Sequence, residues 1–141
     1  MLRAEEVMNR NIITVEKDTP IIQAMETILE NKISGVPVVE DNMKLVGILS
    51  DTDVVSLAYQ FLYESNSPEN MKVRHLMTER VVSFDKDDNL FDVCDFLAKN
   101  LFRRVPITSG GRIVGIISIP DIIEYLLKSN REKRITATKA K

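Results

Sequence analysis

The sequence predicts a mixed α+β (α/β) protein made of two tandem β-α-β-β-α repeats. Two observations lead to this fold class. The stretch that begins at Met8 aligns with the stretch that begins at Met77, and within each stretch short β-branched runs alternate with segments of helical periodicity. A repeat of about fifty residues is too small to close a large core alone, so we expect the two repeats to pack together about a pseudo-two-fold axis.

The internal alignment extends over most of the chain. Val36-Pro37 aligns with Val105-Pro106 in the same register as the two methionines. Beyond the prolines the register shifts by a single residue, and Val46-Gly47-Ile48 then aligns with Val114-Gly115-Ile116. The gap falls in a predicted turn, where a change in length does not shift the core. These matches indicate a tandem duplication.

The first strand and the first helix of each repeat follow from short apolar patterns. Residues 12–15 and 81–84 are β-branched runs too brief for helices, so they are predicted strands. In the first repeat a helix is predicted over residues 20–31, with Asp18 or Thr19 as its cap.

The corresponding helix of the second repeat is predicted to begin at Asp87 or Asp88. Cys94 lies at helical spacing from Leu90 and Leu97, so we expect it in the core. It is the single cysteine of the chain, which excludes an internal disulfide and a metal site made of several cysteines.

A hairpin and a terminal helix complete each repeat. Gly110-Gly111 marks the turn of the second hairpin and not a phosphate-binding loop, because neither the Lys-Ser or Lys-Thr pair nor a helix follows it. The predicted hairpin strands are residues 36–39, 45–49, 105–108 and 113–117, and the predicted terminal helices are residues 51–64 and 120–131.

Composition indicates a globular, soluble protein. Of 141 residues, 44% are apolar and 28% are charged, and the net charge of -2 provides no general attraction to nucleic acid or anionic lipid. The basic residues are concentrated at the C-terminus, so an acidic body carries a basic tail. No apolar stretch approaches the roughly 18 residues of a membrane span, and we expect a cytoplasmic protein without a membrane partner. The expected division is a first repeat (1–64), a linker (65–70), a second repeat (71–131) and a mobile basic tail (132–141).

A Ser-x-x-Asp element recurs where the last strand of each repeat is predicted to enter the terminal helix. The elements are Ser50 with Asp53 and Ser118 with Asp121. One explanation is a capping box, in which the serine and the acid satisfy the first backbone N–H groups of the helix. The other is a ligand site, since strand ends that lead into helix N-termini bind anions and a carboxylate accepts both hydroxyls of a ribose. The two roles are compatible.

The order and spacing of these elements resemble the CBS domain, a nucleotide-sensing module that occurs in tandem pairs. The resemblance extends from Met8 to about Leu127 and rests on the Val-Met start, the Val-Pro strand entry and the Gly-hydrophobic-hydrophobic-Ser-x-x-Asp ending. It implies β-α-β-β-α units in a pseudo-two-fold pair. It also implies clefts for AMP, ADP, ATP or a related adenosyl ligand, without catalysis, a resident cofactor or a metal.

The resemblance also implies which residues line the two clefts. In family members with composite clefts, the ending of one repeat faces the first strand and the pre-proline segment of the other. The aspartates would hold the ribose, and Arg103 and Arg104 fall where the family often contacts phosphate, although a solvated arginine pair would have the same sequence. The expected first site is Ser50, Asp53, Val82, Phe102, Arg103 and Arg104, and the expected second site is Ser118, Asp121, Ile13, Ile33, Ser34 and Gly35.

Three further functional hypotheses follow from the sequence. An enzyme is disfavoured, because His75 is the only histidine and the repeat retains only one acid of the pair Asp51 and Asp53. A protein-interaction or dimerisation module without a metabolite is the main alternative to a sensor, and the apolar terminal helices favour a homodimer. Nucleic-acid binding through the tail is disfavoured, because the tail has no aromatic residue for base stacking. With no effector domain in the chain, a sensor would act on a separate target protein.

Overall fold

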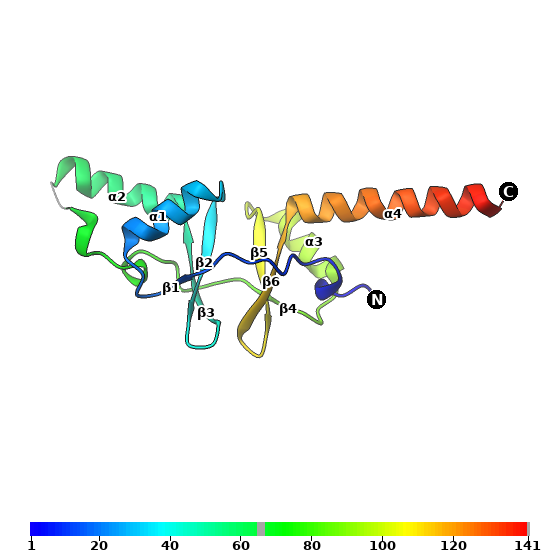
Figure 1. The fold of residues 1–141 in the computed structure, drawn as a ribbon, viewed down its shortest axis with the longest axis horizontal. Coiled ribbons are helices and arrows are strands. Elements are labelled where there is room, and N and C mark those ends of the chain that lie inside the picture. Colours follow the sequence, from blue (N-terminus) through cyan, green and yellow to red (C-terminus); the bar gives the residue numbers. More distant parts are fainter. Residues whose placement is uncertain (65–66, 141) are drawn as a thin grey trace. The chain divides into compact units, whose positions relative to one another are not determined.

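The structure, a computed structural model, describes residues 1–64 and 67–140. These residues form four α-helices and six β-strands in the order expected from the sequence, so the mixed α+β class and the tandem β-α-β-β-α arrangement are confirmed (Figure 1). Residues 65–66 of the expected linker lie outside the described residues, and Pro68–Asn70 forms a short 3-10 helix.

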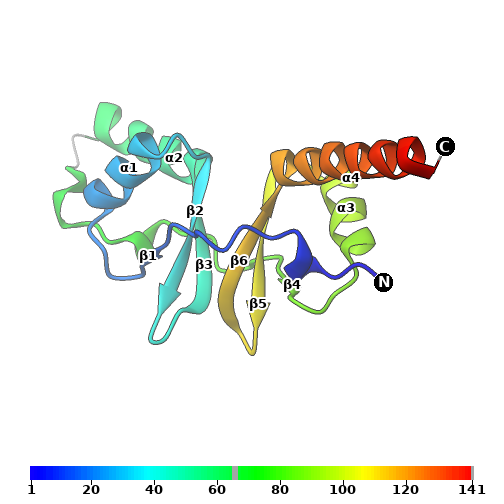
Figure 2. The ribbon, with the colours of Figure 1, turned by 45° about the vertical axis from the view of Figure 1, so that its right-hand side comes forward.

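The described chain divides into two compact units, and each unit contains parts of both repeats. The first unit comprises residues 13–82 and 110–113, and the second comprises residues 1–12, 83–109 and the chain from 114 onward. The segments that precede the repeats, residues 2–8 and 71–77, are therefore exchanged, and we call them the leader segments. In Figure 2 the N-terminal leader, in blue, lies among the elements of the second unit.

The first unit is a three-stranded sheet with two helices. Strand β1 (Val15–Glu16) runs parallel to β2 (Gly35–Glu40), which pairs antiparallel with β3 (Lys44–Ser50). Helix α1 (Ile21–Glu30) connects the parallel strands, and α2 (Asp51–Tyr63) follows β3. The fully buried side chains of this core come from α1, β2, β3 and the second leader segment; they are Ile21, Ala24, Val36, Val38, Leu49 and Val73.

The second unit repeats this pattern. Strand β4 (Phe84–Asp85) runs parallel to β5 (Arg104–Ser109), β6 (Arg112–Ser118) completes the hairpin, and the helices are α3 (Leu90–Lys99) and α4 (Ile119–Ala140). Cys94 packs against this core but is only partly buried, and burial raises the pKa of its thiol. The most deeply buried side chains are Ala4, Val93, Val105, Ile107 and Ile117.

The first strand of each repeat begins later than predicted. Strands β1 and β4 start at Val15 and Phe84, so most of the predicted run in each repeat is not in a strand. The reason is that the residue after each repeated methionine already pairs with a strand of the other repeat: Asn9 pairs with β6, and Thr78 pairs with β3. The β-branched residues that follow only connect this pairing to the start of β1 or β4.

The caps of α1 and α3 also differ from the prediction. Pro20 occupies the N-cap position of α1 and has no polar side-chain atom with which to cap it. The Thr19 hydroxyl instead accepts a hydrogen bond from the Glu16 amide at 3.1 Å. In α3 the cap is Asn89, whose Oδ1 accepts from the Phe91 amide at 3.0 Å. The carboxylate of Asp88 does not cap α3, because it accepts a hydrogen bond from the Asp85 amide at 2.8 Å in the turn before the helix.

Helix α4 is longer than the sequence pattern predicted. It was expected to end near Arg131 but continues to Ala140 (Figure 1). No glycine or proline occurs after Pro120, and lysine, arginine and alanine favour the helical conformation, so nothing in this part of the chain terminates the helix. The basic residues of the expected tail that the structure describes thereby lie on a helix.

Candidate ligand-binding site

Both Ser-x-x-Asp elements form complete capping boxes. At the start of α2, the Asp53 amide donates to Ser50 Oγ at 3.1 Å and the Ser50 amide donates to Asp53 Oδ2 at 2.9 Å. At the start of α4, the Asp121 amide donates to Ser118 Oγ at 3.3 Å and the Ser118 amide donates to Asp121 Oδ2 at 2.9 Å. Each box uses Oδ2, so capping leaves Oδ1 of each aspartate as an acceptor.

A glycine next to each element lets a leader segment approach the last strand. A Cβ atom at Gly47 would lie 2.7 Å from Met77 Sδ and 3.0 Å from the Thr78 carbonyl oxygen, and one at Gly115 would lie 2.5 Å from Met8 Sδ. Because glycine has no side chain, the backbone of Thr78 exchanges two hydrogen bonds with Ile48, at 2.8 and 2.9 Å. The glycine of the repeated Val-Gly-Ile motif is therefore explained by close approach.

This approach brings a residue that the sequence analysis missed next to Asp53. Thr78 Oγ1 donates to the Asp53 carboxylate, at 3.3 Å from Oδ1 and 3.4 Å from Oδ2. Its counterpart in the second unit, Asn9, turns its Oδ1 to the Asn11 amide at 2.9 Å. A sequence signal was available, because both residues directly follow the repeated methionine.

In the first unit, the pre-proline segment lies against the Ser-x-x-Asp element of the same repeat. The Asp51 amide donates to the Ser34 carbonyl at 2.8 Å, and Gly35 is the partner of Ser50 in the β2–β3 ladder. A Cβ at Gly35 would lie 3.1 Å from the Leu49 carbonyl oxygen, so the strands fit closely there. Ile33, Ser34 and Gly35 thus lie beside Ser50, and Ile13, Val82 and Asp53 belong to the same unit.

In the second unit, the arginine pair lies beside Ser118. The Ile119 amide donates to the Arg103 carbonyl at 3.0 Å, and Arg104 begins β5. The Nε atom of Arg104 is buried and has no hydrogen-bond partner among the described residues. Phe102 stacks on Phe96 with ring centroids 5.4 Å apart and keeps about half of its surface exposed. The combination of these arginines with Asp53 in one cleft stays a prediction.

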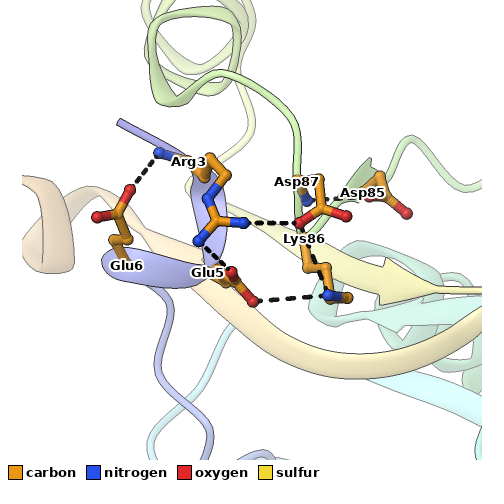
Figure 3. Close-up of polar contacts among 6 residues, drawn as sticks. All are labelled: Arg3, Glu5, Glu6, Asp85, Lys86 and Asp87. Atoms are coloured by element: carbon orange, nitrogen blue, oxygen red, sulfur yellow. Dashed lines mark hydrogen bonds and ion pairs between the residues drawn. The ribbon is translucent and has the colours of Figure 1, made fainter. Parts of the chain in front are cut away.

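An ionic cluster fixes the first leader segment in the second unit (Figure 3). Arg3 contacts Glu5 at 2.8 Å and Asp87 at 3.2 Å, and Lys86 approaches the same two carboxylates at 3.8 and 3.6 Å. The Ala4 amide also donates to the Asp88 carbonyl at 2.8 Å. These contacts position residues 1–12, which carry Asn9 toward the Asp121 element.

A different ion pair occurs at the equivalent place in the first unit. Lys17 Nζ lies 2.6 Å from Glu40 Oε2. The hydrogen bond with Glu40 raises the pKa of Lys17, and the same bond lowers the pKa of Glu40. Arg74, from the second leader segment, contacts Asp18 at 3.0 Å and ties that leader to the unit.

Other kinds of site are not found in the part of the chain that the structure describes. Within it, no group of three or more His, Cys, Asp or Glu side chains is arranged to hold a metal ion. Likewise, no described helix is both long and apolar enough to cross a bilayer.

The fold and the sites together define a class of protein. It is a tandem pair of β-α-β-β-α modules, and in each module an aspartate takes part in the cap at the junction of the last strand and the last helix. Comparison with known families identifies the modules. The CBS domain model matches residues 4–59 and 73–128, so the chain belongs to the CBS domain family and carries the domain twice.

Individual proteins are similar in sequence over most of this chain. An uncharacterized protein of Methanocaldococcus jannaschii is 32% identical over 121 residues, which are 86% of this chain and 41% of that protein. The gamma subunit of the 5'-AMP-activated protein kinase of Dictyostelium discoideum is 31% identical over 127 residues, which are 82% of this chain and 22% of the subunit. The chain thus spans less than half the length of these two proteins.

A solved structure of similar size also matches. The crystal structure of CBSX2 of Arabidopsis thaliana in complex with AMP has a TM-score of 0.80 and 27% identity. The match covers 92% of this chain and 99% of the CBSX2 chain, so here the likeness extends over both chains.

Proposed function

We propose that this chain is a regulatory protein that senses adenine nucleotides with its pair of CBS domains and transmits their occupancy to a separate target protein. The observation that carries the proposal is the duplicated Asp in a capping box. Asp53 and Asp121 are each held by the serine amide through Oδ2. Oδ1 of Asp121 and the remaining acceptor capacity of Oδ1 of Asp53, which also accepts from Thr78 Oγ1, then face ribose hydroxyls at the end of a strand. The capping and recognition roles coexist in one side chain.

The relatives support an adenosine ligand. CBSX2 was solved with AMP, and the kinase gamma subunit belongs to a 5'-AMP-activated enzyme. We propose a related regulatory ligand, AMP, ADP, ATP or another adenosyl compound, for this cytoplasmic chain, with no catalytic step and no resident cofactor.

The proposed clefts are those expected from the family resemblance. Asp53 would hold the ribose in one cleft and Asp121 in the other. The buried, unpartnered Nε of Arg104 supports an anion near the arginine pair, because an unsatisfied buried donor costs about 1–3 kcal/mol that a phosphate oxygen would remove. The proposed lining residues are Ser50, Asp53, Val82, Phe102, Arg103 and Arg104 for the first cleft, and Ser118, Asp121, Ile13, Ile33, Ser34 and Gly35 for the second.

Ligand-induced thermal stabilisation tests the proposal. A ligand present at 100 times its dissociation constant adds about 2.7 kcal/mol per site to the free energy of unfolding. We expect at least one of AMP, ADP, ATP or an uncharged adenosine derivative to raise the melting temperature. Asp53→Asn and Asp121→Asn serve as matched variants, because asparagine keeps some capping ability but loses the charged acceptor, and each should weaken binding more than folding. If none of these compounds changes the melting temperature, the proposed sensor function is wrong.

The second candidate function is a dimerisation or interaction module, and the terminal helices favour it as an additional property. The rings of Tyr59 and Tyr63 contact each other on α2, with centroids 5.1 Å apart and planes tilted by 38°, yet both are mostly exposed. We propose that this surface and the apolar face of α4 form a homodimer interface. Sedimentation should show a species heavier than the 16.0 kDa chain at micromolar concentration. The mostly exposed apolar side chains of the described parts of the two helices are Val55, Tyr59, Phe61, Leu62, Tyr63, Ile123, Leu126, Leu127 and Ile135.

A further inference from the structure

The second half of α4 is strongly basic. Residues 128–141 contain six of the 19 basic residues of the chain and only one of its 21 acidic residues. The structure describes the side chains of residues 128–137, and we call this part of α4 the basic segment. A dense local positive charge therefore lies on one helix, while the remainder of the chain is acidic. The basic side chains of the segment are Lys128, Arg131, Lys133 and Arg134.

The basic segment is exposed and its charges are unpaired within the described structure. Every residue from 130 to 137 is exposed, and the segment continues beyond α3 of the same unit, as Figure 1 and Figure 2 show. Among the described residues, no carboxylate forms an ion pair with its four basic side chains. The helix nevertheless begins on a packed base, because Ile119 and Ile122 contact the core of the second unit. The charges are thus presented on a helix that the fold starts and orients.

The basic side chains are distributed around the whole helix. Successive residues of an α-helix are rotated by about 100°, so the four basic side chains leave no arc wider than about 140° without a positive charge. The apolar residues of the segment, Ile135 and Ala137, lie on nearly opposite sides, about 160° apart by the same rotation. The segment therefore has neither a single basic face nor an apolar face.

This distribution favours one kind of anionic partner. A helix that binds an anionic membrane needs an apolar face opposite its basic face, which the segment lacks. An acidic protein surface contacts one side of a helix and leaves the charges on the other side unpaired. The major groove of B-form DNA is about 12 Å wide, accepts an α-helix of about 10–12 Å in diameter, and has phosphates along both of its edges. Duplex DNA thus matches positive charge on all sides of the segment.

We propose that the basic segment of α4 binds in the major groove of duplex DNA and is held there by phosphate contacts. Contacts of this kind carry no sequence information, so the affinity depends on salt and little on base sequence. The inference goes beyond the proposed adenosine-sensing function and does not depend on it. The lack of an aromatic residue disfavours single-strand binding by base stacking, whereas phosphate contacts with a duplex need no aromatic residue.

Salt-dependent binding of the full chain to a duplex tests the proposal. The probe is a fluorescent DNA duplex of mixed sequence about two helical turns long, and anisotropy measures its affinity. The logarithm of the binding constant falls with the logarithm of the salt concentration by about 0.9 per neutralised phosphate, so four basic side chains predict a slope of up to about 3.6. In the triple variant Arg131→Gln/Lys133→Gln/Arg134→Gln, the slope should fall by up to about 2.7 and the affinity at low salt about tenfold or more.

A charge-matched variant shows whether the position of the charges matters. Lys44→Gln/Lys99→Gln/Arg112→Gln removes the same charge from exposed sites outside α4 and should leave the slope and the affinity nearly unchanged. Circular dichroism checks that both triple variants are folded.

A second pair of variants separates helix geometry from charge. Asn130→Pro keeps all four basic side chains, but proline inside a helix removes a backbone hydrogen bond and kinks or breaks the helix. It should weaken duplex binding several-fold, whereas Asn130→Ala, which preserves the helix, should not.

The outcomes distinguish the partners and separate this inference from the proposed function. The proposal is wrong if the full chain does not bind the duplex at low salt, or if the triple variant in α4 binds as tightly as the wild type. Equal affinity for a single strand of the same length, or unchanged binding by Asn130→Pro, would exclude a helix in the groove. Tighter binding to polyglutamate or to vesicles containing phosphatidylserine would overturn the proposal in favour of an acidic protein or a membrane. None of these results changes the stabilisation by adenine nucleotides that tests the sensor function.

Discussion

The two Ser-x-x-Asp elements have the same cap but different surroundings. The backbone and Oδ2 contacts of Asp53 and Asp121 are the same in kind, and in each unit a leader segment pairs with the last strand. The polar groups around them differ: Thr78 donates to Asp53, whereas Asp121 lies beside a pocket rich in carboxylates. The comparison indicates that duplication preserved the capped aspartate, while substitutions around it gave the two aspartates different polar surroundings.

The largest expected effect concerns the arginines, which stand where the first repeat has Ser34 and Gly35. Replacing Arg103 and Arg104 together by Ala should weaken AMP at one cleft about ten- to a hundredfold and leave adenosine nearly unchanged, because charged hydrogen bonds to phosphate are lost. Titration calorimetry measures both ligands. Arg112→Ala, in the exposed turn region of the second hairpin, is the control and should keep the wild-type affinity.

A double-mutant cycle decides which aspartate shares a ligand with the arginines. Residues that contact the same ligand should be coupled, so the cross-repeat arrangement predicts coupling of the arginine pair with Asp53→Ala and none with Asp121→Ala. The reverse pattern would assign the arginines to the Asp121 element, beside which their own unit places them.

The next effect concerns the two glycines under the leader segments. Gly47→Ala and Gly115→Ala should each destabilise the fold by about 1–3 kcal/mol, because an added methyl group overpacks a filled contact. We expect Gly47→Ala to be the more costly, since its Cβ meets the backbone carbonyl of Thr78, whereas the closest contacts at Gly115 are all with the Met8 side chain. Denaturant unfolding measures both, and a larger cost at Gly115 would contradict the stated cause.

A smaller effect is expected at Thr78. Thr78→Val keeps the shape of the side chain but removes the donor to Asp53, which should lower the free energy of unfolding by about 0.5–1.5 kcal/mol. Asn9→Ala is the comparison in the other unit, and because Asn9 does not donate to Asp121 in this structure its effect should not depend on Asp121. Two double-mutant cycles, measured by unfolding, test whether only Thr78 is coupled to its aspartate. One cycle combines Thr78→Val with Asp53→Asn, and the other combines Asn9→Ala with Asp121→Asn.

The smallest effect concerns the ion pairs of the two lysines, Lys17 and Lys86. The lowered pKa of Glu40 means that its contribution to stability is present above its ordinary pKa of 4.5 and is lost as the pH falls through the lowered value. The raised pKa of Lys17 means that its contribution is lost only as the pH rises beyond 10.5. Glu40→Gln should therefore reduce the acid-side loss of stability in melting curves. Lys86→Met should change it less, because Lys86 Nζ lies 3.8 Å from Glu5 and 3.6 Å from Asp87, beyond hydrogen-bond distance.

The element order was predictable because its signals are local. Periodicity, turn residues and the Val-Pro and Val-Gly-Ile repeats located the hairpins and terminal helices within a few residues, and the Ser-x-x-Asp spacing correctly indicated two caps. The start of β1 was wrong because a β-branched run also suits an extended connection. The end of α4 was wrong because the sequence has no local stop signal there.

The partners of each site residue were harder to predict because they come from distant parts of the chain. Asn9 and Thr78 are separated from Ile116 and Ile48 in sequence, and only the exchange of leader segments brings them together. The repeat marks both residues as equivalent, but nothing local shows that one would donate to an aspartate and the other would not.

The exchange of leader segments has a consequence for synthesis on the ribosome. The first leader, with the buried Ala4 and Met8, packs in a unit whose strands β5 and β6 are translated about a hundred residues later. At roughly 5–20 residues per second, these apolar residues wait on the order of ten seconds for their partners. The second unit therefore cannot fold co-translationally from its N-terminus, and its leader is a site where a chaperone could bind the nascent chain.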